Sequence, residues 1–255
     1  MSSKNKELRF SLSDLNILII GAKLGIGASL STICAEQNAN VILVDKDEPS
    51  ELAENLRQKS LANIMTYGCD ISDREAVESL AAELSQRNYA PHSLALTAGI
   101  THYNDWIETD SETWDQDVKQ IFNVNLTGPI NVARSFLPIM ERNNWGRMVL
   151  VGSIAGRMGG LTSQPHYAAS KGGVHSLTRW LASKYAPSGV LVNAVAPGPT
   201  KTRMTEGRSI DTSKLPLRRM LNPEDVAWPI AFLLSPAAAG MVGVILDVNG
   251  GATFS

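Results

Sequence analysis

Seven short apolar runs, separated by longer segments of helical periodicity, constrain the fold of this chain more than any other feature. They are rich in Val, Ile and Leu and cover residues 16–21, 40–45, 64–70, 93–99, 147–153, 190–196 and 243–248. Because each run is almost continuously apolar, it predicts a strand covered on both faces, with the helical segments as right-handed crossovers between parallel strands. The pattern therefore predicts an α/β fold: a doubly wound, Rossmann-type sheet of seven parallel strands with helices on both faces.

The length of the chain fits one domain. Its 255 residues, 44% of them hydrophobic, can bury one large core, and no repeat or low-complexity linker divides them. We expect residues 1–13 to form a polar N-terminal tail and residues 14–255 a single domain.

The tail has no apolar signal core, and no later run reaches the roughly 20 apolar residues of a membrane helix, so we expect a cytoplasmic protein that binds no membrane. Two cysteines, Cys34 and Cys69, give neither a disulfide framework nor a metal-ligand spacing. The formal net charge of -2 provides no field for nucleic acid, which favours a small-molecule partner.

A glycine-rich turn follows the first apolar run. Gly21, Gly25 and Gly27 have the spacing G-x-x-x-G-x-G and lie directly before a predicted helix. Glycine is required where the backbone turns tightly and where a Cβ would hold a pyrophosphate away from the N–H groups of a helix start. The position predicts a dinucleotide site, and the alternative is a plain tight turn.

Asp45 closes the second apolar run. There a carboxylate can accept hydrogen bonds from the two ribose hydroxyls of NAD, and it would repel the 2′-phosphate of NADP. Lys23 and Lys46 lie close enough in sequence to weaken that repulsion, so NAD is the preferred cofactor and NADP the alternative. A solvated acid at the end of a strand is the other interpretation of Asp45.

Six motifs occur in the order and contexts of the short-chain dehydrogenase/reductase family. They are GAKLGIG (21–27), TAGI (97–100), NVNLTG (123–128), VGSIAG (151–156), YAASKGG (167–173) and VNAVAPGPTKT (192–202). The chain resembles this family over nearly its whole length from about residue 14. It is most similar to the branch of 3-oxoacyl-carrier-protein reductases and of sugar and secondary-alcohol dehydrogenases. The resemblance implies an oxidoreductase that transfers hydride between a CH–OH group and a nicotinamide cofactor.

Tyr167 and Lys171 lie four positions apart in a predicted helix, so they share one helix face. A phenol with a pKa near ~10 is a poor base at neutral pH, and a fall to roughly 7 needs about 4 kcal/mol of preference for the phenolate. Lys171 and a positive nicotinamide ring can supply that preference. The resemblance implies Tyr167 as acid and base, Lys171 as its partner and a ligand of the nicotinamide ribose, and Ser153 as the donor to the substrate oxygen. Taken alone, a pair with this spacing fits an ordinary surface helix.

Pro129 has no N–H to donate to the carbonyl of Asn125, and its ring crowds that carbonyl. The Asn125 carbonyl must therefore find another partner. In the resembled family the matching carbonyl holds a water that links the lysine to solvent, so we hypothesise that Pro129 keeps such a proton relay open. A simple helix kink, with Asn125 hydrated by bulk water, is the alternative.

The resemblance also places residues against the cofactor. Thr202 and the backbone at Thr200 would meet the nicotinamide carboxamide, and Asp70 would meet the adenine, although each could equally cap a turn. The predicted catalytic residues are Asn125, Ser153, Tyr167 and Lys171, with no metal. The predicted cofactor ligands are Gly21, Gly25, Ile26, Gly27, Asp45, Asp70, Ala98, Gly99, Tyr167, Lys171, Pro197, Gly198, Thr200 and Thr202.

Two positions depart from the family pattern. The family usually has Thr before the first glycine and Asn-Asn-Ala-Gly after the fourth strand. This chain has Ile20 at the first position, and Leu96 and Thr97 in place of the two asparagines. Because the first and fourth strands are neighbours in the resembled topology, we hypothesise that Thr97 replaces the lost polar link while Ile20 packs.

The substrate pocket is expected, from the resemblance, after Ser153, near His102 and Tyr103, and under a lid near residues 203–219. The lid carries charges of both signs, which fits an anionic or polyhydroxylated substrate or a solvated loop face; these residues are Arg203, Arg208, Lys214, Glu206 and Asp211. The leading function is an NAD(H)-dependent interconversion of a secondary alcohol and a ketone. The alternatives are a 3-oxoacyl-thioester reductase that uses NADPH and a non-catalytic NAD-binding sensor. The resemblance also implies a homotetramer, built from helices near 111–142 and 165–186 and from the C-terminal strand region.

Overall fold

One sheet of seven parallel strands, in the order β3-β2-β1-β4-β5-β6-β7, forms the centre of the computed structural model, which describes residues 10–160 and 163–254. Each predicted apolar run corresponds to one strand, with β5 beginning one residue earlier and β6 ending one residue later than predicted, so the predicted doubly wound sheet is confirmed. The strands are β1 (Asn16–Ile20), β2 (Asn40–Asp45), β3 (Ile64–Gly68), β4 (Ser93–Leu96), β5 (Gly146–Val151), β6 (Val190–Pro197) and β7 (Ile245–Val248).

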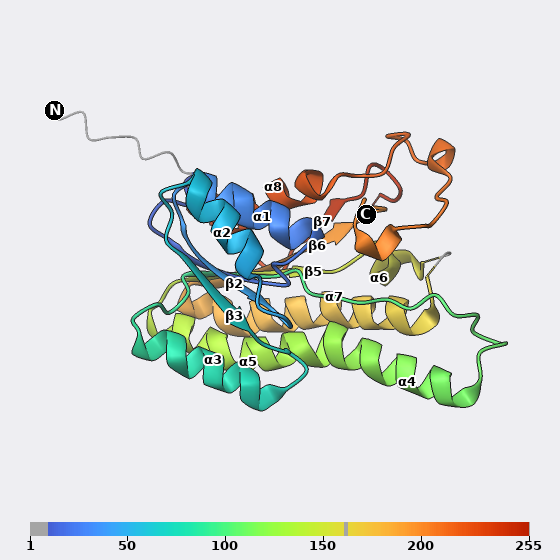
Figure 1. The fold of residues 1–255 in the computed structure, drawn as a ribbon, viewed down its shortest axis with the longest axis horizontal. Helices are drawn as coiled ribbons and strands as arrows, with labels where there is room; N and C mark the ends of the chain where they lie inside the picture. Colours follow the sequence, from blue (N-terminus) through green and yellow to red (C-terminus); the bar gives the residue numbers. More distant parts are fainter. Residues whose placement is uncertain (1–9, 161–162, 255) are drawn as a thin grey trace.

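Helices cover both faces of the sheet (Figure 1). They are α1 (Gly25–Glu36), α2 (Ser50–Lys59), α3 (Arg74–Gln86), α4 (Ser111–Phe122), α5 (Gly128–Arg142), α6 (Ala155–Met158), α7 (Pro165–Tyr185) and α8 (Pro223–Leu234). A π-helical turn, η1 (Asn123–Thr127), joins α4 to α5. Short 3₁₀ turns are η2 (Ala186–Ser188), η3 (Arg203–Thr205), η4 (Thr212–Lys214) and η5 (Pro236–Ala238).

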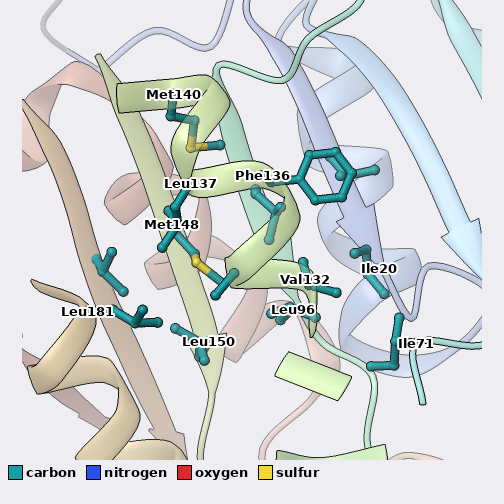
Figure 2. Close-up of a cluster of buried hydrophobic side chains, with 14 of the residues drawn as sticks. Ile20, Ile71, Leu96, Val132, Phe136, Leu137, Met140, Met148, Leu150 and Leu181 are labelled. Carbon is teal, nitrogen blue, oxygen red and sulfur yellow. The ribbon is translucent and has the colours of Figure 1, made fainter. Parts of the chain in front are cut away.

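Alternation along the strands divides the apolar side chains between two cores. Leu18 and Ile20 of β1 point into the core shared with α3, α5 and α7, whereas Ile17 and Ile19 point into the core shared with α1, α2 and α8. The two helix layers lie on opposite sides of the sheet in Figure 1. Figure 2 shows the first core, in which side chains of α5, such as Leu137, lie against Met148 of β5. Both cores hold the strands in place, including β1 and β4, between which the strand order reverses.

In the described part of the chain, no helix is both long and apolar enough to cross a membrane.

Candidate active site

A tight glycine turn leads from β1 into α1. Gly21 has a φ of +85°, and a β-carbon there would lie 2.4 Å from the backbone nitrogen of Ala98. Gly27, in the first turn of α1, is equally restricted, because its β-carbon would lie 2.0 Å from the carbonyl oxygen of Gly21. Only glycine fits at these two positions. The predicted turn is therefore present, at the point where the strand order reverses.

Thr97 supplies the polar link between β1 and β4. Its hydroxyl donates to the carbonyl oxygens of Ile20, at 2.9 Å, and of Gly21, at 3.0 Å. The Ile20 side chain is buried in the core beside Leu96. Both parts of the hypothesis on the unusual residues at these positions are confirmed, since β1 and β4 are neighbours and threonine replaces the missing link while isoleucine packs.

The start of α1 fits a dinucleotide pyrophosphate. Its N-cap residue is the apolar Leu24, and among the described residues no side chain caps the first turn and no acid lies in it. Gly25 has a φ of +57°, and the position of its β-carbon lies 3.1 Å from Cγ2 of Thr202, in the loop after β6. A hollow of about 950 Å³ is lined by both residues. Bare N–H groups at a helix start bind phosphate, so the residues present suit a dinucleotide.

Asp45 lies at the carboxyl end of β2, where it accepts the backbone N–H of Lys23 at 2.9 Å and its neighbour's N–H, that of Lys46, at 2.8 Å. Both lysine side chains turn to other carboxylates. Lys23 Nζ lies 3.3 Å from Asp47, and Lys46 Nζ lies 3.0 Å from Asp70. Lys23 and Lys46 were expected to weaken the repulsion of a 2′-phosphate by Asp45. Their ammonium groups are instead each paired with another carboxylate.

Asp70 follows β3 and takes part in two local contacts. Its carboxylate accepts the N–H of Ser72 at 3.0 Å and the hydroxyl of Ser72 at 2.7 Å, so it does cap a turn. Burial alone would raise the pKa of Asp70, but the bonds from Ser72 and Lys46 outweigh burial and hold it below its usual value. The turn-cap alternative is therefore correct as a description of the chain, and it leaves Asp70 ionised beside the end of β2.

Threonine hydroxyls fasten the loop after β6. Thr205 Oγ1 donates to the carbonyl of Thr200 at 2.7 Å and accepts the N–H of Thr202 at 3.2 Å. Gly198 packs against Asn249, whose carbonyl oxygen would lie 2.6 Å from a β-carbon. Thr205 was not among the predicted residues. The sequence does contain an indication of its role, because Thr205 lies three positions after Thr202, which is the spacing of a capping box.

Tyr167 and Ser153 meet above the carboxyl ends of β5 and β6. Ser153 follows β5, and its Oγ accepts the N–H of Ala155 at 3.1 Å. Burial raises the pKa of Tyr167 to about 12, and a hydrogen bond from Ser153 opposes that shift. The serine thus favours the phenolate form that a general base requires, a contact that was not among the expectations for Ser153.

Lys171 lies one helical turn after Tyr167 on α7, and the two share a helix face as predicted. Its Nζ donates to the carbonyl oxygen of Val151 at 2.9 Å and lies 5.8 Å from the centroid of the Tyr167 ring. The side chain is buried, and burial lowers the pKa of Lys171 to about 8. The partner of the ammonium is a main-chain carbonyl, which no residue identity in the sequence could reveal.

The Tyr167 pKa does not fall in the protein chain alone, although the sequence led us to expect that Lys171 and the nicotinamide ring lower it. Burial disfavours the phenolate of Tyr167 and the ammonium of Lys171 together, so the tyrosine pKa moves up instead of down. A positive nicotinamide ring is the second cation expected from the sequence, and that ring would have to supply correspondingly more of the required shift.

Asn125 lies in the π-helical turn η1, with its side chain buried. Oδ1 accepts the N–H of Ile100 at 2.8 Å, and Nδ2 donates to the carbonyl of Ile100 at 2.9 Å. Near this pair, a β-carbon on Gly99 would lie 3.2 Å from Lys171 Nζ and 3.5 Å from Asn125 Oδ1. The helix departs from α geometry just before Pro129, as predicted, and it does so where the asparagine and the lysine come together.

The expected substrate side of the site carries aromatic residues. The guanidinium of Arg208, in the segment expected to form the lid, stacks on the ring of Tyr103 at 3.5 Å, and Tyr103 lies near enough to Tyr167 to raise the pKa of Tyr167 further. His166, next to Tyr167, is buried in an edge-to-face contact with Trp114, and its ring nitrogens have no hydrogen-bond partner among the described residues. In residues 10–160 and 163–254, no cluster of His, Cys, Asp or Glu is placed to hold a metal ion.

Comparison with known proteins agrees with this geometry. A family model described as "Enoyl-(Acyl carrier protein) reductase" matches residues 21–253. The chain is 35% identical to a galactitol 2-dehydrogenase (L-tagatose-forming) of Cereibacter sphaeroides, over 96% of this chain and 97% of that one. It is 34% identical to the 3-oxoacyl-[acyl-carrier-protein] reductase of Thermotoga maritima, over 92% of this chain and 96% of that one. A crystal structure of a putative NAD(P)-dependent gluconate 5-dehydrogenase from Beutenbergia cavernae with bound NADP superimposes with a TM-score of 0.87 at 32% identity, covering 96% of this chain and 98% of that one.

Proposed function

Because this chain belongs to the short-chain dehydrogenase/reductase family of oxidoreductases, we propose that it interconverts a secondary alcohol and a ketone, with NAD(H) as preferred cofactor and Tyr167 as acid and base. The observation that carries the proposal is the meeting of Tyr167, Ser153 and Lys171 beside Asn125 at the carboxyl edge of the sheet. A non-catalytic sensor would need only the nucleotide site. Here every group of the proton-handling set is present: Ser153 and Lys171 both lie beside Tyr167, and Asn125 and Lys171 are buried.

Each residue of the set has a separate task. NAD, when bound, accepts or returns the hydride. Tyr167 takes the hydroxyl proton of the alcohol or returns it to the ketone oxygen, and Ser153 donates to that same oxygen as negative charge develops on it. Lys171 holds positive charge next to the phenol, and Asn125 connects the lysine to solvent.

The preference for NAD rests on charge. Three carboxylates lie near the end of β2, those of Asp45, Asp47 and Asp70. Two ammonium groups lie there, that of Lys23 paired with Asp47 and that of Lys46 paired with Asp70. The region is therefore net negative, which disfavours a 2′-phosphate. These pairs are largely exposed, and exposed pairs are worth only about 0–1 kcal/mol, so the expected preference is moderate and not absolute.

The proposal extends to assembly as a homotetramer through α4, α5, α7 and the C-terminal strand. Large apolar side chains lie exposed on these helices: Ile130 of α5 is 43% exposed and Trp180 of α7 is 60% exposed. Light scattering at several protein concentrations tests this part, and a monomer at all of them would refute it.

The activity is tested by incubating the protein with NAD+ or NADP+ and an alcohol, and by measuring the absorbance of the NADH or NADPH that forms. The alcohols are sugars, polyols, hydroxy acids and hydroxyacyl thioesters. We expect turnover with an alcohol of at least one class, faster with NAD+ than with NADP+. Turnover confined to NADPH and 3-oxoacyl thioesters would favour the reductase alternative. Tight NAD+ binding without turnover of any class would refute the enzymatic proposal in favour of the sensor.

A further inference from the structure

Ser170 lies between the two central residues of the proposed mechanism in the sequence of α7. Its side chain is turned about 100° around the helix axis from that of Lys171 and about 60° from that of Tyr167. Ser170 is 0% exposed. Its hydroxyl donates to the carbonyl of Tyr167 at 2.8 Å and accepts from Nδ2 of Asn125 at 3.2 Å. Among the described residues, these two partners are the hydrogen-bonded groups through which Ser170 can influence the reaction.

The contact with Ser170 completes the hydrogen bonding of the Asn125 amide. Oδ1 accepts from Ile100, and the two N–H groups of Nδ2 are directed to the carbonyl of Ile100 and to Ser170. A rotation of the amide by 180° would set Oδ1 against the carbonyl oxygen of Ile100, so these partners define one orientation. The asparagine is thus attached to the loop after β4 at one side and to α7 at the other.

These attachments matter because the backbone around Asn125 lacks one normal helical bond. Pro129 has no N–H to donate to the Asn125 carbonyl, and the chain forms a π-helical turn at this point. Gly99 lies against both the Asn125 amide and Lys171 Nζ. The orientation of the carbonyl relative to the lysine therefore depends on how firmly the side chain is held.

We propose that Ser170 is a positioning residue: it fixes Asn125, and through Asn125 the path by which protons reach Lys171 and Tyr167. The inference rests on the proposed function. It predicts that loss of the hydroxyl slows proton transfer while cofactor binding is kept, since the hydrogen bonds of Ser170 within the described residues go to Asn125 and to the main chain of Tyr167.

The first test compares Ser170→Ala with Thr178→Val. Thr178 is also 0% exposed on α7, and its hydroxyl donates only to Val174 of its own helix, at 2.8 Å. We expect Ser170→Ala to lower kcat about tenfold, to raise the solvent deuterium isotope effect on kcat, and to leave the affinity for NADH within twofold. Thr178→Val should leave all three within twofold. Ser170→Cys keeps the side-chain volume with a much weaker hydrogen-bonding group, so it should reproduce the fall in kcat if Ser170→Ala does not fold.

The second test needs no substrate. In thermal unfolding, Ser170→Ala should lower Tm by several degrees in the wild-type background and by less than half as much in an Asn125→Ala background, because a bonded pair is not additive. Additive Tm changes, or a Ser170→Ala kcat and isotope effect equal to those of an active wild type, would overturn the inference. A wild type that turns over no alcohol would instead refute the proposed function, and the Tm cycle would still decide whether Ser170 holds Asn125.

Discussion

Replacing Asp45 with asparagine should remove most of the preference for NAD over NADP. Asparagine keeps an oxygen that can accept the N–H of Lys23, which now lies 2.9 Å from the carboxylate, so the turn should survive. The change removes one negative charge. Two unit charges about 4 Å apart repel by ~1 kcal/mol in water and ~4 kcal/mol at an effective dielectric constant of 20. Asp45 is only half-buried, so we take about 1.5–3 kcal/mol for a phosphate, which is roughly 10- to 100-fold in relative kcat/KM.

The assay measures kcat/KM for NAD+ and for NADP+ with the same saturating alcohol, at low and high salt. Asp47→Asn is the matched control. It removes the same charge two residues further on, from a side chain that is 81% exposed and contacts Lys23 at 3.3 Å. We expect the ratio of the two kcat/KM values to change less than about threefold in the control, because exposed charges are screened. A ratio that changes equally in both variants, or in neither, would refute the assignment of cofactor preference to Asp45.

Three further predictions concern residues that support the site. Thr97→Val removes the hydroxyl that links β1 to β4 and should lower stability by about 1–3 kcal/mol, seen as a lower Tm; an unchanged Tm would show that this link is dispensable. Pro129→Ala restores a helical N–H and should lower kcat and shift its pH profile, so unchanged turnover and profile would refute the proline-held relay. Lys171 has a folded pKa of about 8 against a usual 10.5, so above pH 8 the unfolded chain binds more protons and the Tm of the cofactor-free protein should rise with pH. That rise should be smaller in Lys171→Met, and equal slopes in the two proteins from pH 8 to 10 would contradict the buried ammonium.

The fold was predictable because its strands are covered on both faces. A near-continuous apolar run such as residues 40–45 is typical of a strand that is covered on both faces. The close strand-to-helix turn accepts only glycine at positions 21 and 27, so the glycines there indicated the turn. The pairing of Thr97 with the carbonyls of β1 could also be inferred, since a lost polar residue on one strand called for a polar residue on its neighbour.

The parts of the site that could not be predicted depend on main-chain groups and burial. The carbonyl of Val151 binds Lys171, and both main-chain groups of Ile100 bind Asn125, so any residue at 151 or 100 could have supplied them. The sign of the Tyr167 pKa shift follows from how deeply the phenol is buried, which a spacing of four residues does not specify. The ion pairs of Lys23 with Asp47 and of Lys46 with Asp70 likewise depend on how neighbouring loops pack together.

The role of Tyr167 as acid and base is tested most directly by the kcat of Tyr167→Phe, measured together with the affinity of this variant for NADH. Tyr185→Phe is the control, because Tyr185 ends the same helix and packs in the core away from the site. We expect Tyr167→Phe to lose about 10²–10⁴-fold in kcat and still to bind NADH within about tenfold of wild type, and we expect the control to be unchanged. A Tyr167→Phe enzyme that keeps a kcat within tenfold of wild type would contradict that role.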